Sequence, residues 1–356
     1  MNTKPGAIRI GALAPLTRPG WTEAGHHLLA GLELAVHDIN GAGGISGRPL
    51  ELVVRDTAAD PDRATAAVDE LFALGVAALA GEYHSVVARA AATRAAGLGL
   101  PYLCSSAVLD ILTDGPTDQV ARLSPPQSRG WRLYADHLLA TGHRRIAAVT
   151  QPSVYWASGL RILRDHLAPH GATVLELAPD PDLLDRLAAD GATALLLLTG
   201  HPEPAVPIVR SVRRDPRLTG LLIGAPAGQP EFPEWARALG TDGTGIPFLR
   251  YLPDQLTPLG TRVDTTLRER LGAPPSFVAH EGYDTITVLA VLLRTPGPGA
   301  PPLTASWPHI TIDGTRGRIR FSHAPATGIW QWPDPPLQIT DRDPADPHHF
   351  RTLRMG

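Results

Sequence analysis

The stretch Ala30–Asp60 reads AGLELAVHDINGAGGISGRPLELVVRDTAAD, and it decides the fold. Its first part carries apolar side chains at helical spacing, and the glycine-rich run Asn40–Gly44 ends that helix. The apolar run Leu50–Val54 follows and predicts a buried strand. An earlier apolar run, Ile8–Leu16, predicts another strand. The order strand, helix, strand is typical of a parallel sheet with helical crossovers.

The same alternation continues along the chain and predicts an α/β fold in which helices flank parallel sheets. A first lobe is predicted to have strands 8–14, 50–55, 77–80 and 101–104, with helices 24–39, 61–74, 85–96, 258–271 and 279–294. A second lobe is predicted to have strands 145–150, 173–177, 193–198 and 220–224, with helices 127–141, 156–170, 181–189 and 203–214.

Length and composition narrow the class of protein. With 356 residues the chain is long enough for two domains that each bury a core. A net charge of -3 gives no electrostatic reason to bind nucleic acid or an anionic membrane. No apolar run approaches the length of a membrane span. Cys104 is the one cysteine, which excludes an internal disulfide, and its apolar surroundings predict an inert buried thiol.

Three sequence features carry a resemblance to a known family. The Ala30–Asp60 stretch, the Gly282-Tyr283-Asp284 triplet and the G-x-I-x-F strand Gly317–Phe321 are similar to those of type I periplasmic binding proteins, the leucine/isoleucine/valine-binding class. The resemblance covers residues 7–323. It implies two lobes with doubly wound parallel sheets, joined by a hinge of three crossings. It also implies a small-molecule ligand held between the lobes by hinge closure, in the manner of a Venus flytrap, with no cofactor and no catalysis.

The resemblance also predicts how the chain divides between the lobes. Residues 122–125 are the expected first passage, and Phe248–Pro253 the expected return. The first lobe is expected to contain residues 7–121 and 253–327, the second 122–252 and 328–340, and 341–356 to form an irregular tail. The Pro/Gly cluster 295–302 is expected to be a loop, and Ile329–Trp332 a short strand.

Ligand-binding candidates in the first lobe follow the ends of its predicted strands. Gly81–Ser85 is similar to the family's G-x-x-x-S loop, which implies that Ser85 caps the next helix and contacts a ligand carboxylate. In the following loop, Ser106 keeps a position that contributes backbone atoms. Val108 replaces a family threonine that helps to hold an amino-acid head group. Glu281, beside the G-Y-D triplet, is expected to approach the ligand.

Candidates in the second lobe come from three loops. Val154–Gly159 is similar to the family's D-x-Y-G-x-G segment, with Trp156 in the aromatic position beside Tyr155. His201 replaces a tyrosine that faces the ligand in the family. Ala227 replaces an acidic residue that pairs with the ligand's ammonium group.

Val108 and Ala227 together remove two anchors of an α-amino-acid zwitterion, and an unpaired buried ammonium would cost several kcal/mol. A standard branched-chain amino acid is therefore disfavoured unless Glu82, Glu281 or another acid substitutes. An amide, an aromatic acid, a nucleoside-like compound or another neutral polar metabolite is expected instead. The complete set of ligand-binding candidates is Trp21, Tyr83, His84, Ser85, Ser106, Val108, Tyr155, Trp156, His201, Ala227 and Glu281.

Other kinds of site are weakly supported. The adjacent pairs His26-His27 and His348-His349 cannot chelate a metal from one helix face. Glu82, His84 and Ser85 lie close in sequence, but no G-x-S-x-G motif supports a hydrolase. The glycine-rich run after residue 40 ends a helix, so its amides point the wrong way for a phosphate loop. No metal ligand and no catalytic residue are expected.

The cellular role stays open between three hypotheses. A solute-binding component of an ABC importer would work with a permease outside the cytoplasm. A cytoplasmic sensor, as monomer or homodimer, would signal through a regulator protein, in the way of amide-responsive receptors. An enzyme that has recruited this fold is the third. The start Met1–Gly6 leads straight into the first strand without a leader, which favours the cytoplasm.

Overall fold

A computed structural model describes residues 6–294 and 302–356, and the chain divides into two compact units. Unit 1 contains the residues up to Pro125 together with Gln255–Pro336, and unit 2 contains Pro126–Asp254 together with Leu337–Gly356. The chain therefore passes between the units three times, as predicted. Most of the predicted loop 295–302 lies outside the described residues.

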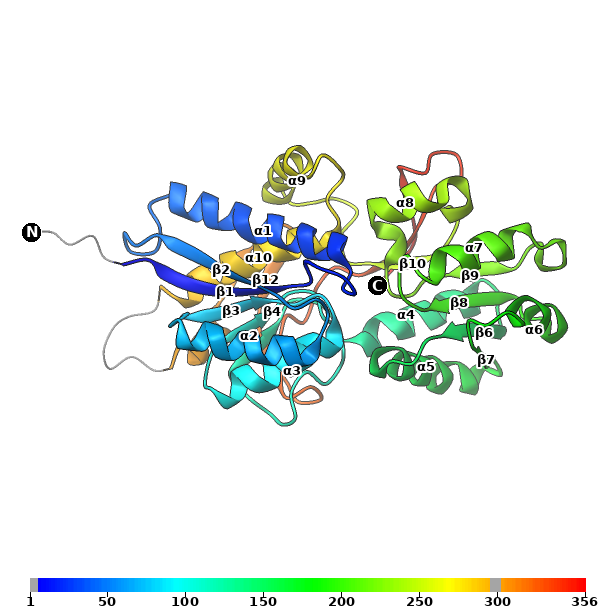
Figure 1. Cartoon of the computed structure of the whole chain (residues 1–356), viewed down its shortest axis with the longest axis horizontal. Coiled ribbons are helices and arrows are strands. Elements are labelled where there is room, and N and C mark those ends of the chain that lie inside the picture. The colour runs from blue at the N-terminus through cyan, green and yellow to red at the C-terminus, as the bar shows by residue number, and fades with distance from the viewer. Residues whose placement is uncertain (1–5, 295–301) are drawn as a thin grey trace, which may run out of the picture. The chain divides into compact units, whose positions relative to one another are not determined.

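Unit 1 is built on a doubly wound sheet (Figure 1). Its strands lie in the order β13-β14-β5-β4-β3-β1-β2, all parallel except β13. Its elements are β1 (Ile8–Ala14), α1 (Thr22–Gly41), β2 (Leu50–Asp56), α2 (Pro61–Ala73), β3 (Ala78–Gly81), α3 (Ser85–Gly97), β4 (Tyr102–Cys104), β5 (Val120–Arg122), α9 (Pro258–Leu271), α10 (Phe277–Leu292), η5 (Leu303–His309), β11 (Thr311–Asp313), β12 (Arg318–Arg320), β13 (Ser322–Ala324) and β14 (Ile329–Gln331).

Unit 2 contains a second parallel sheet in the order β7-β6-β8-β9 and a small antiparallel sheet in the order β10-β15-β16. Its elements are α4 (Gln127–Ala140), β6 (Arg145–Thr150), α5 (Val154–Leu167), η1 (Ala168–His170), β7 (Thr173–Leu177), α6 (Leu183–Asp190), β8 (Ala194–Leu198), α7 (Ala205–Arg214), η2 (Pro216–Leu218), β9 (Leu222–Gly224), η3 (Gln229–Glu231), α8 (Pro233–Leu239), η4 (Gly240–Gly243), β10 (Phe248–Arg250), β15 (Gln338–Arg342) and β16 (Phe350–Met355).

The predicted division of the chain is wrong at several places. Residues 122–125 and 328–336 lie in unit 1, because β5 and β14 pair with each other and extend its sheet. The expected irregular tail, 341–356, instead forms the end of β15 and all of β16, and both strands pair in unit 2. The segment Phe248–Arg250, expected to be a passage between lobes, is the strand β10 to which β15 pairs.

Helices α1 and α10 of unit 1 pack against each other (Figure 1). Two glycines lie where the helices meet. A Cβ atom on Gly31 would lie 1.9 Å from the carbonyl oxygen of Ala279, and one on Gly282 would lie 2.5 Å from that of Leu28. Both distances are far below van der Waals contact, so the two backbones can approach this closely only because these residues lack side chains.

We expect Gly31→Ala to lower the free energy of unfolding by about 1–3 kcal/mol, because the added methyl group forces α1 and α10 apart. Urea denaturation measures this loss. Gly41→Ala on the same helix is the matched control, since no described atom outside its own stretch of helix backbone lies within 4 Å of its Cβ position. An equal effect of both substitutions would contradict the steric explanation.

Candidate functional site

The sheet of unit 1 changes winding direction at β1, which lies between β2 and β3. Loops that follow the strands on either side of such a switch point diverge and leave space for a ligand. Here the loop after β1 and the loop after β3 are linked, because the backbone N–H of Trp21 donates to Nε2 of His84 at 3.1 Å. The Tyr83 ring contacts Trp21 edge to face, with centroids 5.6 Å apart. The structure thus brings together three of the predicted residues.

Glu82, the residue before Tyr83, is fully buried. Its carboxylate accepts hydrogen bonds from the Thr57 hydroxyl at 2.9 Å and from the backbone N–H groups of Tyr83 and His84, both at 2.8 Å. Burial raises the pKa of Glu82 to about 7 against the opposing effect of these donors. Burial also lowers the pKa of His84 to about 4, so this imidazole is neutral at physiological pH.

Ser85 does not cap helix α3 as predicted. The helix begins at Ser85, and the N-cap residue is His84, whose side chain makes no capping hydrogen bond. The Ser85 hydroxyl instead accepts hydrogen bonds from the backbone N–H groups of Val108 at 3.0 Å and Leu109 at 3.3 Å. Ser85 and Val108 are therefore neighbours, and the serine's first role is to hold the loop after β4 against the start of α3.

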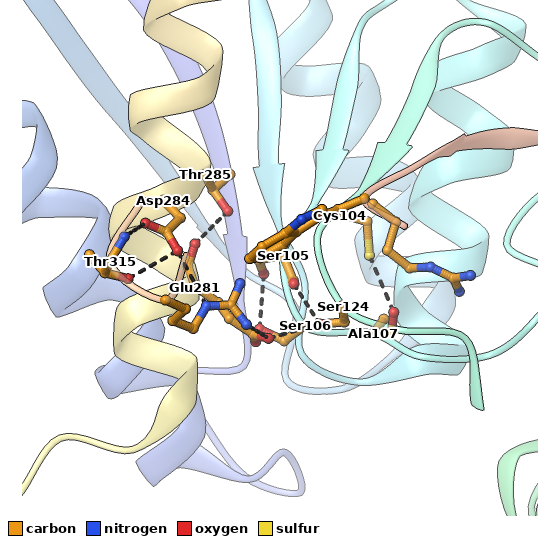
Figure 2. Close-up of polar contacts among 12 residues, drawn as sticks. Cys104, Ser105, Ser106, Ala107, Ser124, Glu281, Asp284, Thr285 and Thr315 are labelled. Carbon is orange, nitrogen blue, oxygen red and sulfur yellow. Dashed lines mark hydrogen bonds and ion pairs between the residues drawn. The ribbon is translucent and has the colours of Figure 1, made fainter. Parts of the chain in front are cut away.

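Glu281 belongs to a buried polar network at the ends of β4 and β5 (Figure 2). Its Oε1 atom accepts hydrogen bonds from the Ser124 hydroxyl at 2.9 Å and from Arg316 at 3.0 Å. Asp284, one helical turn further along α10, accepts from Arg316 Nε at 3.2 Å. Burial raises the pKa of Glu281 to about 7, opposed by Arg316 and by the hydroxyl groups of Ser106 and Ser124. Ser106 and Glu281, both of them predicted ligand-binding residues, are therefore close to each other.

The parallel sheet of unit 2 has its own switch point at β6, which lies between β7 and β8. The loops after β6 and β8 are joined there, because Gln151 Oε1 accepts from the backbone N–H of Gly200 at 2.7 Å. Tyr155 and Trp156 follow β6, with ring centroids 4.7 Å apart, and the Trp131 ring contacts both. Trp156 also lines a cavity of about 370 Å³ at the ends of β6 and β7.

His201 and Ala227 follow β8 and β9 in unit 2. The His201 side chain is completely buried, stacks on Trp235 with centroids 5.5 Å apart, and lies 3.8 Å from the Glu234 carboxylate. Burial lowers the pKa of His201 to about 4. Ala227 is half-buried in the turn before η3 and offers no polar side-chain atom. His201 was predicted to take the place of a tyrosine that faces the ligand. In the structure its imidazole instead packs inside unit 2.

The sequence did not point to three of these residues. Thr57 donates to Glu82, Arg316 joins two buried carboxylates, and Trp131 supports the aromatic pair of unit 2. Their partners lie far away in the chain, so no local pattern marks them. The one available signal was Arg316 beside Gly317, at the start of the G-x-I-x-F strand.

The described residues lack two further kinds of feature. No group of three or more His, Cys, Asp or Glu side chains among them is arranged to hold a metal ion. None of their helices combines the length and the apolar character that crossing a membrane requires. Cys104 is a free, buried thiol whose pKa burial raises to about 11.

Comparison with known proteins finds one family. A family model described as "Periplasmic binding protein" matches residues 7–330. Leu/Ile/Val-binding protein homolog 7 of Brucella melitensis biotype 1 is 35% identical over 119 residues, which are 33% of this chain and 29% of that protein. Homolog 8 of Brucella abortus is 34% identical over the same shares of the two chains. The match therefore spans less than a third of the length of these relatives.

Solved structures share the whole fold at low sequence identity. A solute-binding protein of an ABC transporter from R. palustris, in complex with benzoate, has a TM-score of 0.82 at 20% identity, covering 98% of this chain and 96% of that one. A leucine-binding protein of Thermotoga maritima has a TM-score of 0.82 at 19% identity, covering 97% of both chains. A branched-chain amino acid-binding protein of Streptococcus pneumoniae, in complex with isoleucine, has a TM-score of 0.80 at 18% identity, covering 98% and 99%.

Proposed function

Because the chain belongs to the type I periplasmic binding protein family, we propose that it is a solute-binding protein of an ABC transporter whose ligand carries no α-ammonium group. The ligand class we favour is an organic acid or amide with an apolar or aromatic body. Chains of this family are periplasmic, which favours the extracytoplasmic alternative over the cytoplasmic expectation, with a permease as the partner. The matched relatives and structures are binding proteins, which favours binding without turnover.

The main support for this proposal is that two buried carboxylates already accept hydrogen bonds from other parts of unit 1. Glu82 and Glu281 are the acids that we expected to replace the lost partner of an ammonium group. Glu82 accepts hydrogen bonds from Thr57 and two backbone amides, and Glu281 accepts from Ser124 and Arg316 at Oε1, while its Oε2 atom is buried without a hydrogen-bond partner among the described residues. Drawing Glu82 or the Oε1 atom of Glu281 toward a ligand would break hydrogen bonds in a buried environment, at a cost of roughly 1–3 kcal/mol for each polar group left unpaired.

The remaining candidates favour a flat, apolar or anionic ligand. Trp21 and Tyr83 in unit 1, and Tyr155 and Trp156 in unit 2, provide aromatic surfaces at the ends of the parallel strands. His84 is neutral and its Nε2 atom accepts from Trp21, so the hydrogen bond that it could offer a ligand without adding charge is a donation from Nδ1. Helix α3 begins at Ser85, and the first-turn amides of a helix favour a carboxylate or carbonyl oxygen.

Matched ligand pairs test this proposal directly. Leucine and isocaproate differ only in the ammonium group, and so do phenylalanine and hydrocinnamate. In a thermal-shift assay that also includes benzoate and benzamide, we expect one or more of the ammonium-free compounds to stabilise the protein. A ligand at 100 times its Kd adds about 2.7 kcal/mol, which is easily measured. Stabilisation by leucine or phenylalanine, but not by their ammonium-free partners, would overturn the proposal.

A variant tests the role of position 227. We expect Ala227→Glu to bring measurable leucine binding, because it restores an acid in the turn after β9. Isothermal titration would detect this gain at a Kd below about 1 mM, which corresponds to about -4 kcal/mol. Ala168→Glu, at an exposed position of the same unit, is the matched control. Equal leucine binding by the two variants would show that the acid at position 227 is not what matters.

A further inference from the structure

The two units are joined by three connecting segments, defined here as residues 122–126, 254–257 and 331–337. We propose that Glu281, Asp284 and Arg316 form an anchor cluster that ties the unit 1 ends of all three connecting segments to helix α10, so that the three ends hold or loosen together. This inference goes beyond the proposed function and does not depend on which ligand is bound.

The anchor cluster is a buried ion network in unit 1, and Figure 2 labels two of its members, Glu281 and Asp284. The Arg316 guanidinium donates to Glu281 at 3.0 Å and to Asp284 at 3.2 Å, and all three side chains have no exposed surface. Asp284 also accepts from the backbone N–H of Thr315 at 2.7 Å and from its hydroxyl at 3.0 Å. Charge-assisted hydrogen bonds are strong in such an environment, and breaking one leaves an uncompensated buried charge. The cluster is therefore a stiff element.

The first connecting segment is attached through Ser124. Its hydroxyl group lies 2.9 Å from Glu281 Oε1 and 2.8 Å from the carbonyl oxygen of Ser105, and its single O–H can donate to either acceptor. The backbone N–H of Leu123 donates to the carbonyl oxygen of Cys104 at 3.0 Å. The segment is thus bonded both to the end of β4 and to the anchor cluster.

The second connecting segment is attached through Thr257, the N-cap residue of α9. The Thr257 hydroxyl lies 2.9 Å from the carbonyl oxygen of Gly314 and 3.1 Å from that of Thr315. Its backbone N–H donates to the carbonyl oxygen of Thr315 at 3.3 Å. Because Asp284 fixes Thr315, the second segment depends on the anchor cluster through this hairpin.

The third connecting segment is attached through Gln331 and Trp332. The Cζ atom of Arg316 lies over the Trp332 ring, 5.3 Å from the ring centroid. The Gln331 amide nitrogen donates to the carbonyl oxygen of Ser124 at 2.8 Å, and the Trp332 backbone N–H donates to that of Arg122 at 3.0 Å. The third segment is therefore bonded to the first as well as to the anchor cluster.

Hydrogen exchange on the full chain without ligand tests this coupling. The informative amides are those of Leu123, Thr257 and Trp332, one in each connecting segment, all hydrogen-bonded in the structure. In Arg316→Lys, which keeps the charge but loses the planar fork, we expect all three amides to exchange at least tenfold faster. Amides of β1 should change less. Arg318→Lys, an exposed position on the same hairpin, is the control and should leave all three unchanged.

A second variant makes the test independent of the charge. Ser124→Ala removes one hydroxyl group from the first segment only, and we expect the amides of Thr257 and Trp332 to exchange faster as well. If Arg316→Lys does not fold, Ser124→Ala alone tests whether the three segments are coupled. Faster exchange confined to residues 122–126, or to the 313–318 hairpin in Arg316→Lys, would overturn the proposal. Ligand binding is not part of the readout, so a failure of the proposed ligand class leaves this result interpretable.

Discussion

Replacing Arg316 with methionine is expected to lower the free energy of unfolding by about 3–5 kcal/mol at pH 8. Methionine is of similar length and apolar, so it preserves much of the packing but removes the cation. Glu281 and Asp284 would then lie buried without their shared partner, and a buried pair that loses one member costs far more than an exposed one. Urea denaturation at pH 8 measures the loss.

Arg318→Met provides the matched comparison, because it removes an exposed arginine two residues away. A further check is the pH dependence of the Arg316→Met effect. Since the pKa of Glu281 is raised to about 7, this carboxyl is largely protonated at pH 5, and the penalty for leaving it unpaired should shrink there. A loss below about 1 kcal/mol at pH 8 would show that Arg316 behaves like a surface arginine.

The order of elements in both lobes could be predicted because the relevant signals are local. Apolar runs such as Leu50–Val54 and the glycine stop after Asn40 depend only on neighbouring residues, and the observed β2 and α1 agree with them. The tail could not be predicted in this way. Its strand β15 pairs with β10, about ninety residues earlier, and a segment rich in proline and aspartate carries no strand signal of its own.

The candidate site shows the same limit. Trp21, Tyr83 and His84 could be assigned to adjacent loops because parallel strands end at one edge of a sheet. The bonding of Ser85 to the backbone of Val108 could not be anticipated, since a serine at a helix start normally caps that helix. Arg316 was missed because arginine is rarely buried, and its two carboxylate partners lie about thirty residues away.

The contrast bears on function. The residues that the sequence identified offer aromatic surface and neutral polar groups. The contacts that it missed are the hydrogen bonds and ion pairs that hold the buried carboxylates of Glu82 and Glu281 in place. Glu82 and Glu281, taken from the sequence alone, remain candidates for binding an ammonium group. Only their partners Thr57, Ser124 and Arg316 make them part of the scaffold instead.

The free energy of unfolding of Glu82→Gln, relative to wild type, is expected to rise by about 3 kcal/mol between pH 4.5 and pH 8. The pKa of Glu82 is raised from 4.5 to about 7 by burial. Between these values only the folded protein holds the proton, so rising pH favours unfolding. The contribution of Glu82 to stability is therefore complete below about pH 4.5 and is lost as the pH rises through about 7. Glutamine keeps the shape and cannot ionise.

Neighbouring groups must be separated from this effect. Asp56 and Tyr102 lie in the electrostatic environment of Glu82, and the neutral His84 acts in the opposite direction. Because the pKa of His84 is lowered to about 4, the unfolded chain takes up a proton there below about 6.5, and stability falls as the pH falls. In the wild type the two slopes partly cancel. The difference between variant and wild type removes the His84 contribution and isolates Glu82.

We therefore expect the stability of Glu82→Gln, relative to wild type, to rise steadily from pH 4.5 to about pH 7 and then level off. Urea denaturation at closely spaced pH values measures this difference. Glu70→Gln, whose side chain is 61% exposed, is the matched control for the loss of a carboxyl group without burial. A constant difference between Glu82→Gln and wild type would show that Glu82 has the same pKa in the folded and the unfolded protein. In that case the three hydrogen bonds from Thr57, Tyr83 and His84 would offset the effect of burial on Glu82.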